Sequence, residues 1–252
     1  MASIIRSKKT KIFYKLLIII FWILIWQIIY MTINKEIIIP SPASVFKKLM
    51  ELILQKDFWV SVSISFIKTL FGFALALAVG GFLGFVIYFH RIIKDFLSPI
   101  ITIIRTVPVV SISFIAIFFI QSEYIPIFVA FIMVIPIAIE NVYAGIANTD
   151  KKYLEMAQTY KFKWTDILKN IYFPSTLPYF ISAASIGVGY AWKSSITAEI
   201  LASVKYGIGD QLYLTKIYLQ SDAMFAWTIV IVLLSVIFSK LFKLMVKNYD
   251  KN

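Results

Sequence analysis

The stretch EMAQTYKFKWTDILKNIYFP, from Glu155 to Pro174, separates two long apolar segments of the 252-residue chain. It carries five charged side chains in twenty residues, so it is too polar to lie in the hydrocarbon of a membrane. It also has too many apolar residues to be an ordinary solvated loop. The rest of the chain therefore has to show which surface this stretch contacts.

The composition of the chain indicates a membrane protein. Hydrophobic residues make up 60% of it and charged residues only 15%, whereas about a quarter of a soluble domain is charged. The absence of cysteine excludes disulfides and thiolate metal sites. The single histidine, His90, leaves little for histidine-based catalysis or a metal site. We therefore expect no catalytic residues, no metal and no cofactor bound by this chain.

Six apolar segments are each long enough to cross about 30 Å of hydrocarbon, which takes about 20 helical residues. We expect all six to be helices because lipid offers no partners to backbone polar groups. The first lacks a small-residue cleavage site and is too long and too aromatic for a cleaved signal peptide. The third contains Arg105 and two prolines. The predicted spans are 12–33, 61–88, 96–121, 124–146, 176–202 and 223–243.

The sequence thus predicts an all-α, polytopic protein with about six transmembrane helices. Residues 12–245 would form a single transmembrane domain that includes the polar loop 151–172. Residues 1–11 and 246–252 would be tails.

The distribution of basic residues predicts the orientation of these spans. Sixteen of the 25 lysines and arginines fall on the side of the two termini: five at the first span, two after the second, five in the loop 147–174 and four at the C-terminal end. Six fall on the other side and three, Lys68, Arg105 and Lys193, lie within spans. The positive-inside rule then places both termini and the Glu155–Pro174 stretch in the cytoplasm of a cell with the chain in its inner or plasma membrane. Topology explains most of the net charge of +12, so we expect no nucleic-acid partner.

The apolar residues of the polar loop recur at helical spacing, which predicts two short helices, each with an apolar face. One interpretation is an amphipathic helix in the lipid headgroup layer, with its lysines on anionic lipid. The other is a docking site for a cytoplasmic partner. The apolar positions are Leu154, Ala157, Phe162, Trp164, Ile167, Leu168 and Ile171.

The spacing of the loop favours the docking site. It resembles the "EAA" loop of permease subunits in binding-protein-dependent ABC importers, whose pattern is Glu-Ala-Ala, three residues, Gly, nine residues and Ile-x-Leu-Pro. Here Glu155-Met156-Ala157 begins the pattern, Lys161 takes the place of the glycine, and Ile-Tyr-Phe-Pro follows nine residues later at 171–174. The departures are Met156, Lys161 and Phe173. A lysine in a left-handed turn costs about 1 kcal/mol, so the turn geometry at Lys161 stays open at this point.

The resemblance extends over about residues 37–245, in order, to the nitrate/sulfonate/taurine-type branch of these permeases. The segments that carry it are "IIPSPASVFKKL", "FGFALALAVGGFLGFVI", "SPIITIIRTVPVVSISFIAIFF" and "IGVGYAWKSSITAEILA" followed by "GIGDQLY". It implies a type I ABC importer permease fold, a second permease copy in a homodimer, an external solute-binding protein and two cytoplasmic ATPase subunits, which bind the ATP. The residues to which it assigns ATPase coupling are Glu155, Met156, Ala157, Lys161, Trp164, Ile171 and Pro174.

Small residues recur at a spacing of four in two of the predicted spans. A Gly-x-x-x-Gly pair at Gly80 and Gly84 permits close approach of helices, and 183–187 and 185–189 repeat this spacing. The interpretations are ordinary packing or sliding between two halves of a dimer.

Ser41 is a candidate N-cap with Pro42 in the first turn of a helix. That helix would lie on the outer leaflet and could help to seat a binding protein.

Charged groups within predicted spans usually face a cavity or a partner, because each costs about 2.5–3.5 kcal/mol at a helix centre. Such groups include Lys68, Arg105, Glu140, Lys193 and Glu199. They indicate either salt bridges that fix packing or a translocation path for a small anion or polar solute. For the path, we predict Arg105, Trp192, Lys193 and Glu199.

The missing motifs narrow the function further. No glycine is followed by lysine, so the chain lacks the phosphate-binding loop of ATPases and ATP hydrolysis is expected in a separate subunit. The resemblance to the permease branch implies that the chain is a transport subunit for a nitrate-, sulfonate- or taurine-like anion or a vitamin-precursor-like compound. The alternative is an ion-gradient-driven transporter or channel, which needs no docking loop with this spacing.

Overall fold

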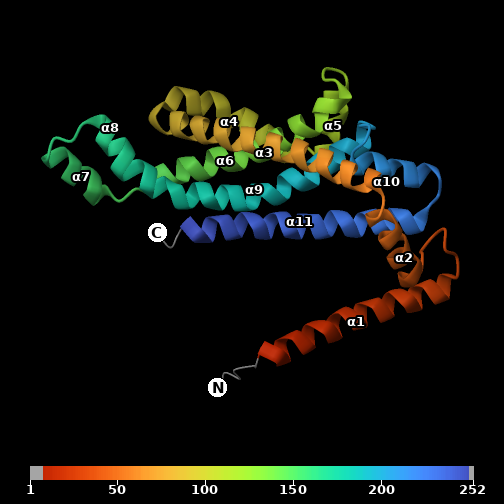
Figure 1. The fold of residues 1–252 in the computed structure, drawn as a ribbon. Helices are drawn as coiled ribbons and strands as arrows, with labels where there is room; N and C mark the ends of the chain where they lie inside the picture. The colour runs from red at the N-terminus through yellow and green to blue at the C-terminus, as the bar shows by residue number, and fades with distance from the viewer. Residues whose placement is uncertain (1–7, 250–252) are drawn as a thin grey trace. The chain divides into compact units, whose positions relative to one another are not determined.

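The computed structural model describes residues 8–249, and this part of the chain consists of helices and connections without strands. The all-α prediction is confirmed (Figure 1). The elements are α1 (Lys8–Ile33), α2 (Pro42–Ile53), α3 (Lys56–Phe89), α4 (Arg91–Thr106), α5 (Val109–Ile117), η1 (Ser122–Tyr124), α6 (Ile125–Ala147), α7 (Lys151–Thr159), α8 (Trp164–Ile167), η2 (Leu168–Tyr172), α9 (Phe173–Leu201), α10 (Ile208–Ile217) and α11 (Ser221–Tyr249).

Four helical stretches of the described chain are long and apolar enough to cross a membrane, and a bent pair makes a fifth span if its two helices are counted together. The four are Phe13–Ile33, Lys56–Phe89, Ser122–Ala147 and Ser221–Leu244. The predicted fifth span corresponds to α9, which has 29 residues but is less apolar. Its small and hydroxyl-bearing residues are largely buried against other helices, where strong hydropathy is not required.

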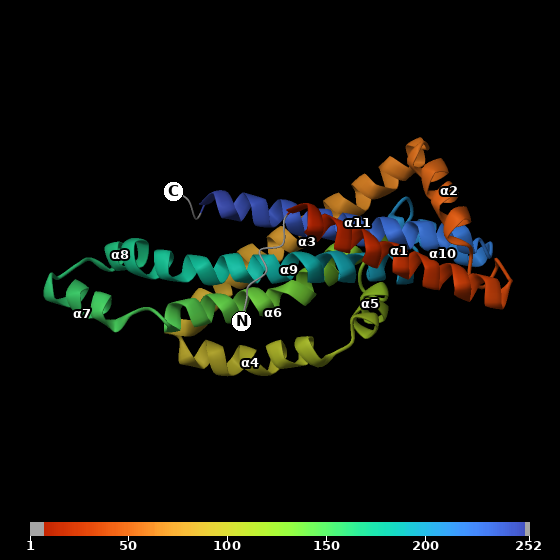
Figure 2. The ribbon, with the colours of Figure 1, turned by 90° about the horizontal axis from the view of Figure 1, so that it is seen from below.

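The predicted third span is broken. α4 and α5 meet at an angle of 103° (Figure 2). Pro108 has no backbone N–H, and it restricts Val107 to an extended conformation with φ −72° and ψ 130°. The helix therefore ends before the proline and a new one begins after it.

By its internal contacts the described chain divides into two compact units: residues 8–59 with 212–230, and residues 60–211 with 231–249. In the second unit α6 and α9 pack along each other, and α3 packs on α6 through its glycines. A Cβ on Gly80 would lie 2.6 Å from Ala138 Cβ, and one on Gly84 would lie 2.7 Å from the Ile139 carbonyl oxygen. In α9, a Cβ on Gly187 would meet Val134, whereas one on Gly189 would meet nothing within 4 Å. Three of these four glycines thus serve helix packing.

The first unit holds α2 and the beginning of α11. The Ser41 hydroxyl accepts a hydrogen bond from Ser44 N at 3.0 Å, which confirms the predicted N-cap. The buried face of α2 is Val45, Leu49 and Leu52. Trp26 donates from Nε1 to the Pro40 carbonyl at 3.0 Å. The rings of Phe58 and Trp227 stack with centroids 5.1 Å apart.

Candidate functional site

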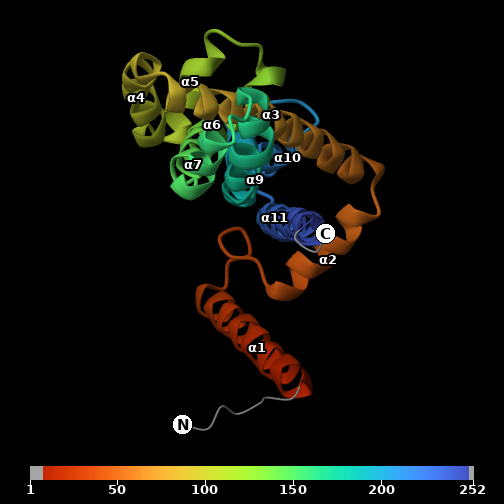
Figure 3. The same ribbon diagram turned by 90° about the vertical axis from the view of Figure 1, so that its left-hand side faces the viewer.

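The polar loop forms a helical hairpin at one end of the second unit, and this end faces the viewer in Figure 3. α7 begins four residues after α6 ends, and Asp150 caps it by accepting from Lys152 N at 2.9 Å. α8 continues through the π-helical turn η2 directly into α9. The loop is therefore attached through short helical connections to both α6 and α9.

Lys161 makes the turn between the two helices in the left-handed conformation, with φ +50°. Phe162 N donates to the Ala157 carbonyl at 2.9 Å, and Lys161 N donates to the Gln158 carbonyl at 3.0 Å. These two bonds form a Schellman motif, which usually has glycine at the position of Lys161. The structure thus answers the question left open by the sequence: the turn is kept despite the lysine.

Replacing Lys161 by glycine is expected to stabilise this turn. Glycine removes the cost of the left-handed conformation, but it also gives the unfolded chain more conformational freedom, which opposes folding. The net gain in the free energy of unfolding is about 0.5–1 kcal/mol. Hydrogen exchange should show stronger protection of the amides of residues 160–162. Lys163→Gly is the control, because Lys163 has φ −67° and gains nothing from glycine. Equal protection changes in both variants would contradict the prediction.

The inner face of the hairpin packs against the ends of the spans. Val142, Ile146 and Tyr172 form a buried cluster, and Leu154, Ile167 and Leu168 pack on it together with aromatic residues of α3. The Trp164 ring lies 5.3 Å from that of Phe89 and 6.1 Å from that of Tyr172, between centroids. Burial and the neighbouring Tyr88 raise the pKa of the Tyr172 phenol above its ordinary value. The hairpin is thus held by apolar contacts.

The outer face of the hairpin carries exposed rings: Tyr153, Tyr160, Phe162 and part of Trp164. Of the seven predicted coupling residues, Ala157 and Ile171 are buried and hold the hairpin in place. The other five are exposed, and they are Glu155, Met156, Lys161, Trp164 and Pro174. All seven lie within the hairpin and the first turn of α9, so the structure brings them together.

The four predicted path residues occupy different surroundings. Arg105, at the end of α4, forms an ion pair with Glu140 of α6. Lys193 is exposed on α9 and makes no ion pair within the described residues. Trp192 is buried and donates from Nε1 to the Ile231 carbonyl at 3.1 Å. The structure does not gather these three residues into one site.

Glu199, the fourth, lies in a buried polar cluster at the end of α9. Its Oε2 accepts from Ser65 Oγ at 2.7 Å and from Gly209 N at 3.0 Å. Ser65 Oγ in turn accepts from Ile208 N at 2.9 Å. The first N–H groups of a helix have no partner within it, and here Ser65 and Glu199 accept from two of them, so these two residues together hold the N-terminus of α10.

Sequence reasoning missed Ser65 and the neighbours of Glu199. The only local signal was Gly-Ile-Gly at 207–209. A Cβ on Gly209 would lie 2.3 Å from Glu199 Cβ, so no larger residue fits without a shift. The partner serine is 134 positions away from the glutamate and leaves no pattern in the sequence.

Comparison with known proteins agrees with this architecture. Residues 72–252 match the family described as "Binding-protein-dependent transport system inner membrane component". The putative aliphatic sulfonates transport permease protein SsuC of Bacillus subtilis is 26% identical over 211 residues, which cover 82% of this chain and 76% of SsuC. The nitrate import permease protein NrtB of Synechocystis sp. is 28% identical over 209 residues, covering 79% and 74% of the two chains.

A solved structure shows the same fold. A chain of the bacterial alginate ABC transporter, in complex with alginate pentasaccharide-bound periplasmic protein, superposes with a TM-score of 0.61 at 15% identity. The match covers 96% of this chain and 95% of that one. The fold is therefore that of type I ABC importer permeases. With a family match over most of its length, the chain belongs to the inner membrane components of binding-protein-dependent transport systems and is an ABC importer permease subunit.

Proposed function

We propose that this chain moves a small anion, of the nitrate, sulfonate or taurine kind, or a vitamin-precursor-like compound, in an importer driven by a separate ATPase. The observation that carries the proposal is the α7–α8 hairpin, which is fixed on its inner face and presents uncovered rings on its outer face. Exposed aromatic residues around a rigid support are typical of protein docking surfaces.

The connections of the hairpin suit it to transmit movement. α7 is joined to α6 by a short capped link, and α8 is joined to α9 without a break. Since α6 and α9 pack along each other, a displacement of the hairpin acts on both central helices at once. The ATPase can shift the permease between two conformations only if it binds one of them more tightly than the other.

The same proposal includes the topology and the other partners. The excess of basic residues in this loop and in the terminal segments supports a topology with the loop and both termini in the cytoplasm. An external binding protein would deliver the solute to the opposite side. A second copy of the chain would complete the transporter as a homodimer, and α4 offers it largely exposed apolar side chains, among them Ile92 and Phe96.

An anionic solute is supported by Lys193 more than by Arg105. The Arg105 charge is offset by Glu140, whereas the Lys193 ammonium has no ion-pair partner within the described residues. The relatives SsuC and NrtB are named as permeases for aliphatic sulfonates and for nitrate, and both of these solutes are anions.

A pull-down of the tagged chain from its host in mild detergent tests the coupling. We expect an ATPase to co-purify with the native chain and to be lost with Glu155→Lys, because the substitution reverses an exposed charge on the docking face. Glu123→Lys is the matched control, since Glu123 is also exposed but lies in η1, between α5 and α6. Retention of the ATPase by Glu155→Lys, or recovery of none with the native chain in several detergents, would contradict the proposal.

A further inference from the structure

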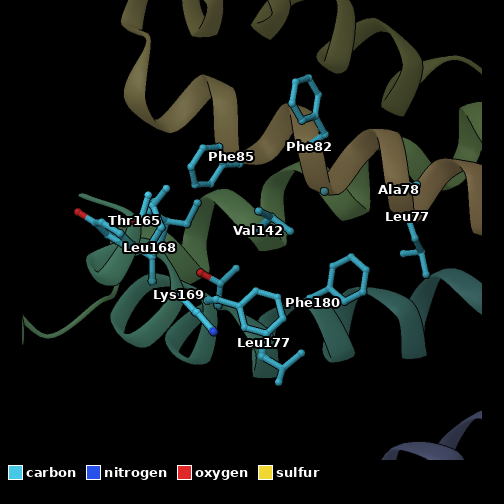
Figure 4. A pocket seen from close by; sticks show the side chains of 15 residues that line it. Leu77, Ala78, Phe82, Phe85, Val142, Thr165, Leu168, Lys169, Leu177 and Phe180 are labelled. Atoms are coloured by element: carbon cyan, nitrogen blue, oxygen red, sulfur yellow. The ribbon is translucent and has the colours of Figure 1, made fainter. Parts of the chain in front are cut away.

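An apolar groove of about 760 Å³ lies beside the hairpin in the second unit. One wall is α3, with Leu77, Phe82 and Phe85, and the other is η2 and the start of α9, with Leu177 and Phe180 (Figure 4). Binding sites for small molecules are commonly about 300–1,000 Å³, so the groove has the size of a binding site.

The rim of the groove is open on its side. Phe82 is 67% exposed and Phe173 is 63% exposed, although both line the groove. Phe82 lies within the predicted span 61–88, where the surrounding medium would be hydrocarbon, and Phe173 lies three residues before the predicted span 176–202. An apolar chain can therefore enter from the membrane, and an ion or sugar gains nothing from these walls.

Among the described residues that line the groove, Lys169 alone is charged. It lies in η2, is exposed, and forms no ion pair within the described residues. An ammonium group beside apolar walls suits an amphiphile that carries negative charge at one end. Lysine also binds phosphate well as a point charge.

The charge around this end of the unit points to the same ligand. Residues 90–95 and 148–172 contain seven lysines and arginines and four aspartates and glutamates. Basic clusters at the cytoplasmic end of membrane helices attract anionic lipid.

We propose that this groove binds an anionic phospholipid, with an acyl chain between α3 and α9 and the phosphate on Lys169. The bound chain would lie against Leu168 and Tyr172 of η2, which joins the hairpin to α9. The lining of the groove includes none of the four residues predicted for the solute path.

Native mass spectrometry of the full-length chain in mild detergent tests this proposal. The protein is mixed with phosphatidylglycerol or with phosphatidylcholine of the same acyl chains. We expect phosphatidylglycerol adducts to be retained about fivefold better, which corresponds to one charge interaction of about 1 kcal/mol. Lys169→Met should remove this preference, and Lys163→Glu, a change outside the groove, should leave a preference for the anionic lipid.

A second variant tests the groove itself. Ala78 is exposed and lines the groove, so Ala78→Trp should fill it and reduce retention of both lipids without changing the charge. Equal retention of the two lipids by the native chain would overturn the proposal, as would a preference that survives Lys169→Met. Dimers that carry no lipid and dissociate on Ala78→Trp would also overturn it, because a second copy would then occupy the groove.

Discussion

Replacing Glu199 by leucine is expected to lower the stability of the chain by about 3 kcal/mol. The substitution leaves the Ser65 hydroxyl and the Gly209 N–H buried without their acceptor, and each such loss costs about 1–3 kcal/mol. Thermal unfolding in detergent should show a melting temperature lower by about 6–12 °C.

Two further variants separate the hydrogen bonds from the charge. Glu199→Gln keeps a carbonyl oxygen as acceptor, so it should cost less than half as much as the leucine variant. Ser65→Ala removes a residue that contacts Glu199, so the effects of Ser65→Ala and Glu199→Leu should not add in the double variant. A leucine variant that melts at the native temperature would show that α10 is held by other contacts.

The second large effect is expected at the contact between α3 and α6. A Cβ on Gly84 would lie 2.7 Å from the Ile139 carbonyl oxygen and 2.8 Å from Val142 Cβ, so Gly84→Ala forces two helix backbones apart. We expect a loss of about 2 kcal/mol, which is within the usual cost of overpacking.

Gly189→Ala is the matched control for this substitution. Both glycines lie inside long helices, but a Cβ on Gly189 meets nothing within 4 Å. Alanine should therefore stabilise α9 by about 0.5–1 kcal/mol through its better helix propensity. The two variants should shift the melting temperature in opposite directions, and a rise in both would show that α3 does not depend on close approach.

Local features of the fold could be predicted from the sequence because neighbouring residues determine them. Ser41 and Pro42 indicated the start of α2, and the loop spacing placed Lys161 at the turn. The prolines marked the third span as unusual, but its 103° bend depends on how α4 and α5 pack on α6. The sequence also predicted the span 176–202, which corresponds to α9, a helix whose small and hydroxyl-bearing residues are largely buried.

Contacts between distant residues could not be predicted in the same way. Arg105 finds Glu140 on another helix, 35 residues away, and Glu199 finds Ser65 at 134 residues. Only the charge of Arg105, Glu140 and Glu199 within spans indicated that each needs a partner. Which residue becomes the partner depends on how the helices pack against each other.

The break at Pro108 has a consequence for the backbone of the third span. A helix that stops and restarts leaves carbonyl and N–H groups without partners within either helix, and the missing N–H of proline removes only one donor. In hydrocarbon each unsatisfied group costs several kcal/mol, so lipid cannot be the medium around residues 106–110. If the break lies at membrane depth, water or a protein surface has to reach it there.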